Sequence, residues 1–280
     1  MNLGIMTSLK HKSPTEWAEK NASLGLKSVV FPIDYLAGDD LVTAYKEAAD
    51  KAGLQIAEVG VWRNTLAADL KERRHWIDYA VGQLRMADRI GACCCVNVVG
   101  TPYGPRWDGG YRGNFSKELW DMAVEMIRQI IDEAQPEHTC CAIETMPWMI
   151  PGSPDEYLKL LEDVDRPRFG VHLDVVNMIN NPRRYFFNDE FLHECFDKLK
   201  GRIVSCHLKD IRLKEEYTFQ LEECACGEGA LDIKLYARLA TAENPCMPMM
   251  IEHLDSDEEY ISSVKYVKNL LREDKSFYKK

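Results

Sequence analysis

The alternation of short apolar runs with amphipathic stretches most constrains the fold of this 280-residue chain. The runs are rich in β-branched residues, which is typical of buried strands, and the stretches between them have helical periodicity. Strands are predicted at 3–7, 28–33, 55–62, 92–99, 140–144, 168–174, 203–210 and 249–252. Helices are predicted at 13–24, 39–52, 69–90, 119–134, from 153 onward, and at 188–200, 231–239 and 257–271. Strands that alternate with helices form a parallel sheet, and eight such units without a linker favour closure. The prediction is a single-domain (β/α)8 TIM barrel of the α/β class.

The domain is expected to span 1–280, with 272–280 as a loose polar tail. A doubly wound open sheet is the alternative architecture. The segment after the first strand, 7–12, contains no glycine and so lacks the glycine-rich turn of a dinucleotide site. The barrel is therefore preferred.

Composition limits the classes of binding partner and the cellular compartment that we expect for this chain. The net charge of −10 argues against a nucleic-acid partner, because phosphate backbones are bound by clustered basic residues. No apolar run reaches the roughly 20 residues of a membrane span, so no membrane partner is expected. The consecutive cysteines Cys93, Cys94 and Cys95, and the pair Cys140 and Cys141, lie inside apolar runs. Such cysteines behave as small buried hydrophobes, which indicates a reducing, cytoplasmic location.

Four residues close the last four predicted strands. They are Glu144, Asp174, His207 and Glu252. Because the carboxyl ends of barrel strands meet at one face, these side chains are expected to lie together. Three carboxylates in one pocket repel one another unless a cation neutralises them. Three oxygen donors and one imidazole suit a single divalent ion, Mn²⁺ in the first place, with Mg²⁺, Co²⁺ or Zn²⁺ as alternatives.

Further residues at the same strand ends are candidates for the substrate site. Lys209 shares a strand face with His207, so it is a candidate acid, base or electrostatic clamp. Trp62, Arg63 and Asn64 close the third strand and would offer a substrate an aromatic surface for stacking and polar groups for hydrogen bonding. Glu228 lies between two glycines in a loop expected near the pocket. For each of these residues, ordinary packing or a salt bridge at the barrel mouth is the competing interpretation.

The motifs at these positions resemble the xylose isomerase-like TIM barrel superfamily, in its sugar phosphate isomerase/epimerase branch. They are I-E-T at Glu144, H-L-D at Asp174, C-H-L-K-D at His207, G-E-G-A-L-D from Gly227, and M-I-E-H at Glu252. The resemblance covers nearly the whole chain. It implies that the four strand-end residues bind one divalent ion and that the two glutamates flank the substrate.

The resemblance also implies a reaction. Glu144 and Glu252 would remove and return a proton next to a carbonyl, while the metal stabilises the enediolate, giving a divalent-metal-dependent sugar isomerase or epimerase. Ketose 3-epimerases of this superfamily carry a substrate-binding histidine three residues after the metal-binding aspartate. Asn177 stands at that position here. Arg212 matches the place of a substrate-binding arginine.

Other functions stay open on the sequence. A metal-dependent dehydratase or lyase acting on a keto-sugar or inosose would use the same first proton transfer. A non-catalytic sugar-binding or complex-forming subunit is a further alternative, which the intact set of four residues argues against. A multi-zinc nuclease is disfavoured because Trp62-Arg63-Asn64 and Gly100-Thr101-Pro102 offer no histidines. The expected partner is a small sugar or polyol, with homo-oligomer formation left open.

Overall fold

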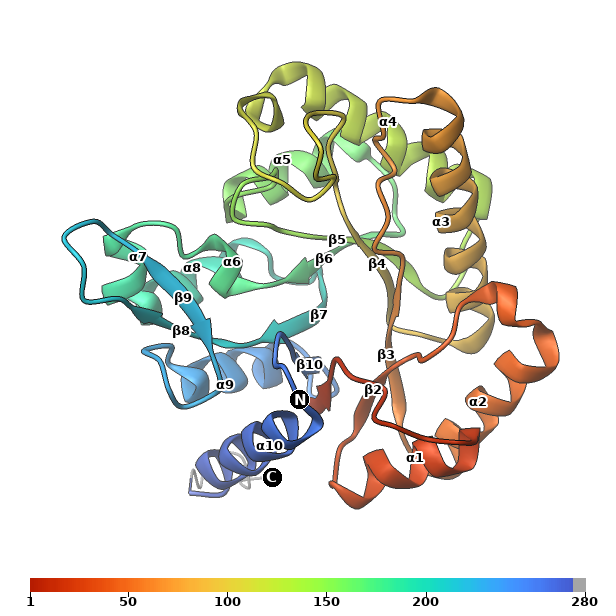
Figure 1. The fold of residues 1–280 in the computed structure, drawn as a ribbon, viewed down its shortest axis with the longest axis vertical. Helices are drawn as coiled ribbons and strands as arrows, with labels where there is room; N and C mark the ends of the chain where they lie inside the picture. The colour runs from red at the N-terminus through yellow and green to blue at the C-terminus, as the bar shows by residue number, and fades with distance from the viewer. Residues whose placement is uncertain (274–280) are drawn as a thin grey trace.

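Eight parallel strands form a nearly closed barrel in the computed structural model, which describes residues 1–273 (Figure 1). The predicted (β/α)8 barrel is thereby confirmed. The hydrogen-bonded order is β1-β10-β7-β6-β5-β4-β3-β2. The strands are β1 (Asn2–Ile5), β2 (Ser28–Val30), β3 (Gln55–Gly60), β4 (Cys94–Val98), β5 (Cys140–Glu144), β6 (Phe169–Leu173), β7 (Ile203–Leu208) and β10 (Pro248–Ile251).

The barrel closes where β1 meets β2. The Lys27 backbone N–H donates to the Leu3 carbonyl oxygen at 2.9 Å. Gly4 permits this approach, because a Cβ on Gly4 would lie 2.6 Å from the carbonyl oxygen of Ser28. The close contact requires a residue without a side chain.

Helices surround the strands on the outside of the barrel (Figure 1). They are α1 (Pro14–Ser23), α2 (Asp39–Lys51), α3 (Leu70–Ile90), α4 (Lys117–Ala134), α5 (Pro154–Val164), α6 (Val175–Met178), α7 (Pro182–Phe186), α8 (Asn188–Lys198), α9 (Ile233–Glu243) and α10 (Asp257–Arg272), with 3-10 turns η1 (Tyr35–Ala37) and η2 (Arg112–Phe115). The hydroxyls of Ser13, Ser153 and Ser256 each accept the N–H of the third residue of the following helix. Such caps satisfy N–H groups that have no partner within the helix.

Successive side chains of each strand point alternately outward and inward, so the barrel has two shells of buried side chains. One shell packs between strands and helices and includes Leu84, Leu119, Ile127 and Tyr157, all fully buried. The other lies inside the barrel. Its lower part is small and apolar, with Cys94, Val96 and Ala142 in contact. Polar residues follow above it, toward the carboxyl ends of the strands, where the predicted site lies.

One part of the fold was not predicted. An antiparallel hairpin of β8 (Asp210–Leu213) and β9 (Leu221–Cys224) follows β7 and lies outside the barrel as an arm (Figure 1). Its connection, 214–220, lacks the short Asn-Gly or Asp-Gly turn that marks a hairpin in a sequence. The short helices α6 and α7 were likewise missed, because single turns carry no periodic signal.

The loose tail expected at 272–280 stays a prediction. Helix α10 ends at Arg272, and residues 274–280 of the predicted tail lie outside the described residues. Within residues 1–273, no helix has the length and apolar character needed to cross a membrane. All ten cysteines, each within this range, are free.

Candidate metal centre

The four predicted metal ligands meet at the carboxyl end of the barrel. Glu144 is the last residue of β5, and Asp174 directly follows β6. His207 lies near the end of β7, and Glu252 directly follows β10. All four are buried, and one ligand atom from each lies within 4.8 Å of the others. This distance suits donors that share one cation.

The imidazole of His207 lies between the two glutamates. Its Nδ1 is 2.9 Å from Oε1 of Glu144 and 2.7 Å from Oε2 of Glu252. Strands β5 and β10 are separated in the sheet by β6 and β7, so the glutamates border the site from two sides. Both carboxylates therefore meet at the same nitrogen of the His207 ring, Nδ1.

Asp174 is held in place by the start of α6. Its Oδ1 caps this short helix by accepting the N–H of Asn177 at 3.0 Å. The other oxygen, Oδ2, is buried and forms an ion pair with Lys209, whose Nζ lies at 2.7 Å. Asn177 also contributes its side chain, whose Nδ2 donates to the Thr145 carbonyl at 2.9 Å and lies 3.4 Å from Oε1 of Glu144. The predicted substrate contact Asn177 thus lies beside the metal ligands.

Lys209 is the cationic member of the site. The whole residue is only 2 % exposed, and its Nζ lies 2.7 Å from both Asp174 Oδ2 and Glu252 Oε1. Its side chain therefore points into the site, as the alternation along the strand predicts. A buried ammonium needs such partners, because an unpaired charge in the interior is costly.

Burial and charge shift the pKa values of these groups in opposite directions. Burial raises the pKa of Asp174. Burial alone would also raise the pKa of Glu252, but His207 and Lys209 outweigh it and hold that pKa well below its usual range. For His207, burial favours the neutral ring, yet Glu252, Glu144 and Glu58 together raise its pKa well above the ordinary value. The positively charged groups of His207 and Lys209 thus lie against the carboxylates of the site.

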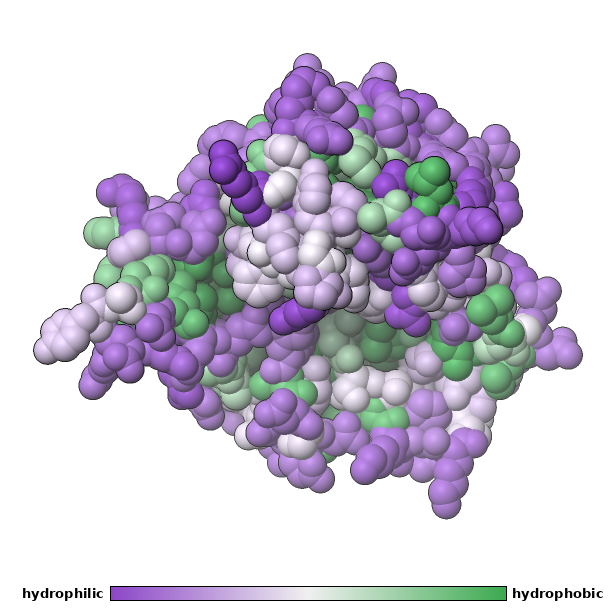
Figure 2. Space-filling view, turned by 45° about the horizontal axis from the view of Figure 1, so that its top comes forward, coloured by the Kyte–Doolittle hydropathy of each residue, from purple (hydrophilic) through white to green (hydrophobic). Residues whose placement is uncertain are grey.

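A pocket of about 440 Å³ opens above the four ligands. Glu144, His207 and Glu252 line it together with the aromatic residues Trp62 and Trp107. Its remaining described lining is Met6, Val98, Asp108, Met146, His253, Leu254 and Tyr260, which includes no arginine or lysine. In Figure 2, hydrophobic residues gather in a hollow across the middle of the molecule, and hydrophilic residues cover most of the outer surface.

Trp62 reaches the pocket through an uncommon backbone conformation. Its φ is +48°, in the left-handed region that bulky residues rarely adopt. Its indole stacks beside the His207 ring at 6.4 Å between centroids, with 26° between the planes. His253, on the opposite side of the barrel mouth, also has a positive φ, of +56°. Strained residues of this kind concentrate at functional sites.

Four other predicted substrate contacts lie elsewhere. The guanidinium of Arg63 stacks on Trp76 at 5.2 Å, and the Asn64 amide donates to the Thr101 carbonyl at 2.9 Å. Arg212, in β8, pairs with Glu222 of β9 at 2.5 Å. The side chain of Glu228 is 61 % exposed and lies 3.9 Å from Arg212. None of the four is among the residues that line the pocket, and their contacts with a substrate stay predictions.

Two acidic residues near the centre were missed in the sequence. Glu58, in the middle of β3, is 0 % exposed, and its Oε2 lies 3.3 Å from Nε2 of His207. A glutamate inside an apolar strand, on the same face as Trp62, was the signal that could have revealed it. Glu223 of β9 lies 2.6 Å from Nδ1 of His253 and 3.3 Å from Nζ of Lys209. The unpredicted hairpin brings it there.

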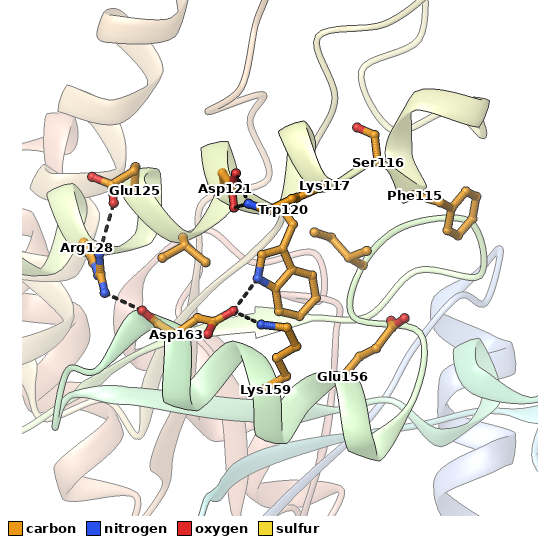
Figure 3. A pocket seen from close by; sticks show the side chains of 12 residues that line it. Phe115, Ser116, Lys117, Trp120, Asp121, Glu125, Arg128, Glu156, Lys159 and Asp163 are labelled. Carbon is orange, nitrogen blue, oxygen red and sulfur yellow. Dashed lines mark hydrogen bonds and ion pairs between the residues drawn. The ribbon is translucent and has the colours of Figure 1, made fainter.

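A larger hollow, of about 700 Å³, lies on the outside of the barrel between α4 and α5 (Figure 3). Its charged side chains are engaged with one another. Lys117 pairs with Asp121 at 2.6 Å, Lys159 pairs with Asp163, and the Trp120 Nε1 donates to Asp163 at 2.6 Å. These pairs leave the hollow without the converging reactive groups that distinguish the centre at the strand ends.

The donor set fits a divalent cation. Three carboxylates and an imidazole supply oxygen and nitrogen donors of the kind that Mn²⁺, Mg²⁺, Co²⁺ and Zn²⁺ accept. One donor atom from each of the four buried residues lies within 4.8 Å of the others, and a cation bound by them would relieve the mutual repulsion of the three carboxylates. This cluster could therefore hold one metal ion.

Known structures with the same architecture come from several organisms, and no curated protein sequence matches. A D-psicose 3-epimerase from Clostridium cellulolyticum, solved with D-tagatose, is 12% identical with a TM-score of 0.72, over 97% of this chain and 98% of that one. The probable 3-DHS dehydratase of Bacillus anthracis is 14% identical with a TM-score of 0.72, over 97% and 99% of the two chains. A xylose isomerase-like barrel protein from Mycobacterium smegmatis, in complex with magnesium, is 17% identical with a TM-score of 0.68, over 92% and 87%.

Identities this low demonstrate a shared fold and no more. The family assignment comes from the sequence model of the xylose isomerase-like TIM barrel family, which matches residues 18–270. The matched range contains β2 to β10 and all four strand-end residues. This chain belongs to the xylose isomerase-like TIM barrel family.

Proposed function

We propose that the chain is a divalent-metal-dependent isomerase or epimerase acting on a small sugar or polyol. The observation that carries the proposal is the convergence of Glu144, Asp174, His207 and Glu252 within 4.8 Å, at the base of a pocket walled by aromatic residues. A divalent ion in this centre supplies positive charge that stabilises negative charge developing on a carbonyl oxygen. Mn²⁺ is the ion proposed first, because most of the donors are carboxylates.

The two glutamates are the proposed proton carriers. Glu144 and Glu252 border the site from β5 and from the end of β10, so a substrate between them would present one face to each. One carboxylate accepts the proton from carbon and the other returns a proton to the opposite face. Lys209, 2.7 Å from Glu252, stabilises the ionised form of that carboxylate.

The pocket suits an uncharged substrate. Trp62 and Trp107 offer flat apolar surfaces for the C–H face of a sugar, and no arginine or lysine lines the described pocket. A neighbouring hollow shares Met6, Leu254 and Tyr260 with it. One lysine, Lys10, lines this hollow, together with Asp255 and with Asp257 and Glu258 in the first turn of α10. Helix N-termini bind phosphate in many barrels, but acidic residues at this helix start would repel it. A free sugar or polyol is therefore the proposed substrate.

The names of the structural neighbours include both an epimerase and a probable dehydratase. A dehydratase or lyase begins with the same proton removal and then expels a hydroxyl group from the adjacent carbon. Product analysis distinguishes the two reactions, because an epimer keeps the mass of the substrate and dehydration lowers it by one water.

The test is exchange of carbon-bound hydrogen with D₂O. Free ketoses, inososes and 3-keto-glycosides would be incubated with the protein and Mn²⁺, and then with EDTA, and followed by NMR. We expect exchange that depends on the metal and falls by about 10²- to 10⁴-fold in Glu144→Gln and Glu252→Gln. The control is Glu194→Gln, which makes the same change at an exposed residue of α8. A metal-loaded protein that exchanges hydrogen in no compound of the panel would refute the proposal.

A further inference from the structure

A second buried cluster lies below the proposed metal ligands inside the barrel. It consists of Glu58 from β3, His172 from β6 and the far side of the His207 ring. Glu58 and His172 are both 0 % exposed. Their function is not accounted for by the reaction proposed above, since neither residue lines the pocket.

Glu58 is in contact with all three polar groups around it. Its Oε1 accepts a hydrogen bond from the Ser205 hydroxyl at 2.6 Å and lies 3.6 Å from Nε2 of His172. Its Oε2 lies 3.3 Å from Nε2 of His207. A buried carboxylate is costly without such partners, so its retention in the barrel interior needs a reason.

The two nitrogens of His207 have different partners. Nδ1 faces Glu144 and Glu252, whereas Nε2 faces Glu58. A histidine binds a metal through one nitrogen, and the hydrogen bond of the other nitrogen selects the tautomer and fixes the ring. The ring of His172 packs edge-on against the His207 ring at 4.1 Å and 82°, which further restricts its rotation.

We propose that Glu58 is a positioning residue that accepts the Nε2–H of His207 and thereby presents Nδ1 as the metal ligand. This inference rests on the metal-dependent function proposed above. Ser205 assists by orienting the Glu58 carboxylate through its 2.6 Å hydrogen bond. The contact between Glu58 and His207 joins residues that are 149 positions apart in the chain. It forms because the side chains of Glu58 on β3 and His207 on β7 both point into the barrel interior.

The same cluster suggests one competing arrangement. Ligand atoms of Glu58, His172 and His207 also lie within 4.8 Å of one another, which is compatible with a second cation. A second ion bound at Nε2 would require His207 to offer both nitrogens as lone pairs at once. The positioning role predicts instead a proton on Nε2 and a single ion per chain.

The first experiment measures the affinity and stoichiometry of Mn²⁺ binding by competition with a coloured chelator. Glu58→Gln keeps the volume of the side chain, but its amide can face His207 with either an acceptor or a donor. We expect one ion per wild-type chain and a loss of affinity of about 10- to 100-fold in Glu58→Gln.

The matched control is Asp210→Asn, another exchange of a buried carboxylate for an amide. Asp210 is 1 % exposed and accepts the backbone N–H groups of Ile211, Gly227, Gly229 and Leu231. Asp210→Asn should lower the melting temperature and leave the affinity for Mn²⁺ unchanged. If it weakens binding as much as Glu58→Gln does, a general loss of structure explains the effect and the inference fails.

The second experiment reads the tautomer directly and needs only the wild-type fold. Protein labelled with ¹⁵N-histidine and loaded with diamagnetic Zn²⁺ or Mg²⁺ should show His207 with its proton on Nε2, in a spectrum assigned by comparison with His207→Gln. Glu58→Gln should lose this signature. A proton on Nδ1 in the loaded wild type, or two ions per chain, would overturn the positioning role. A wild type that binds no ion would refute the proposed function as well, whereas equal affinity in wild type and Glu58→Gln refutes only this inference.

Discussion

Replacing Lys209 with methionine removes a buried ammonium and keeps a side chain of similar length. The Nζ of Lys209 lies 2.7 Å from one oxygen each of Asp174 and Glu252. At an effective dielectric constant of about 20, each contact is worth about 6 kcal/mol of attraction before the cost of burying the charges is subtracted. Glu252 can escape its loss by taking up a proton, which costs about 4 kcal/mol at pH 7 from an ordinary pKa, and the cost is lower for Asp174, because burial raises its pKa. We therefore expect Lys209→Met to lower the free energy of unfolding by about 3–5 kcal/mol in EDTA.

A divalent ion changes this expectation. The ion supplies positive charge to the same carboxylates. In saturating Mn²⁺, Lys209→Met should therefore lower the free energy of unfolding by less than half as much as it does in EDTA. The affinity for Mn²⁺ should rise, because the ion no longer competes with an ammonium for Asp174 and Glu252. The assay is urea unfolding followed by circular dichroism, in EDTA and in Mn²⁺, together with a titration of the metal.

The control variant is Lys198→Met on α8. Lys198 also contacts two carboxylates, Asp155 at 2.8 Å and Glu194 at 2.9 Å, but at the surface. Exposed pairs contribute about 0–1 kcal/mol, so this change should be small and independent of the metal. An equal loss of stability for Lys209→Met in EDTA and in Mn²⁺ would show that Lys209 acts through packing alone, and the electrostatic reasoning would be wrong.

Three further predictions concern stability. Asp88 accepts hydrogen bonds from the backbone N–H groups of Glu137, His138 and Thr139, at 3.0, 2.6 and 2.9 Å. Burial raises the pKa of Asp88, but the three hydrogen bonds outweigh burial and hold this pKa below its usual range. Its stabilisation is therefore complete above the unfolded pKa of about 3.9 and is lost as the pH falls through the lower folded value. Asp88→Asn should lower the free energy of unfolding in urea by about 1–3 kcal/mol at pH 7 and by progressively less toward pH 2. A difference between wild type and variant that stays the same at all pH values would contradict this account. Gly4→Ala should cost about 1–3 kcal/mol, because its Cβ would lie 2.6 Å from the Ser28 carbonyl, whereas Gly152→Ala, with its nearest atom at 3.6 Å, should be close to neutral. Mn²⁺ at about 100 times its dissociation constant should raise the free energy of unfolding by about 2.7 kcal/mol, and an unchanged melting temperature would exclude tight binding to the folded chain.

The sequence by itself determined the barrel and the strands that carry the site. Strand and helix periods recur often enough to define eight repeats, and hydrophobic burial on both faces of a parallel strand leaves polar residues mainly near its ends. Glu144, Asp174, His207 and Glu252 could be recognised for this reason. Alternation along β7 also predicted that Lys209 would point the same way as His207, and the structure places it there.

The tertiary structure alone decided which side chains contact one another. Glu58 is on the same inward face as Trp62, but only the stagger of the strands brings it level with Nε2 of His207. Arg63 and Arg212 follow strands that end at the site, yet stacking on Trp76 and pairing with Glu222 hold them outside the pocket. Long side chains choose among several nearby partners, and local sequence does not specify that choice. Distances across the barrel are therefore set by tertiary packing, whereas the local sequence specifies the succession of strands along the chain and the polar residues that each strand carries.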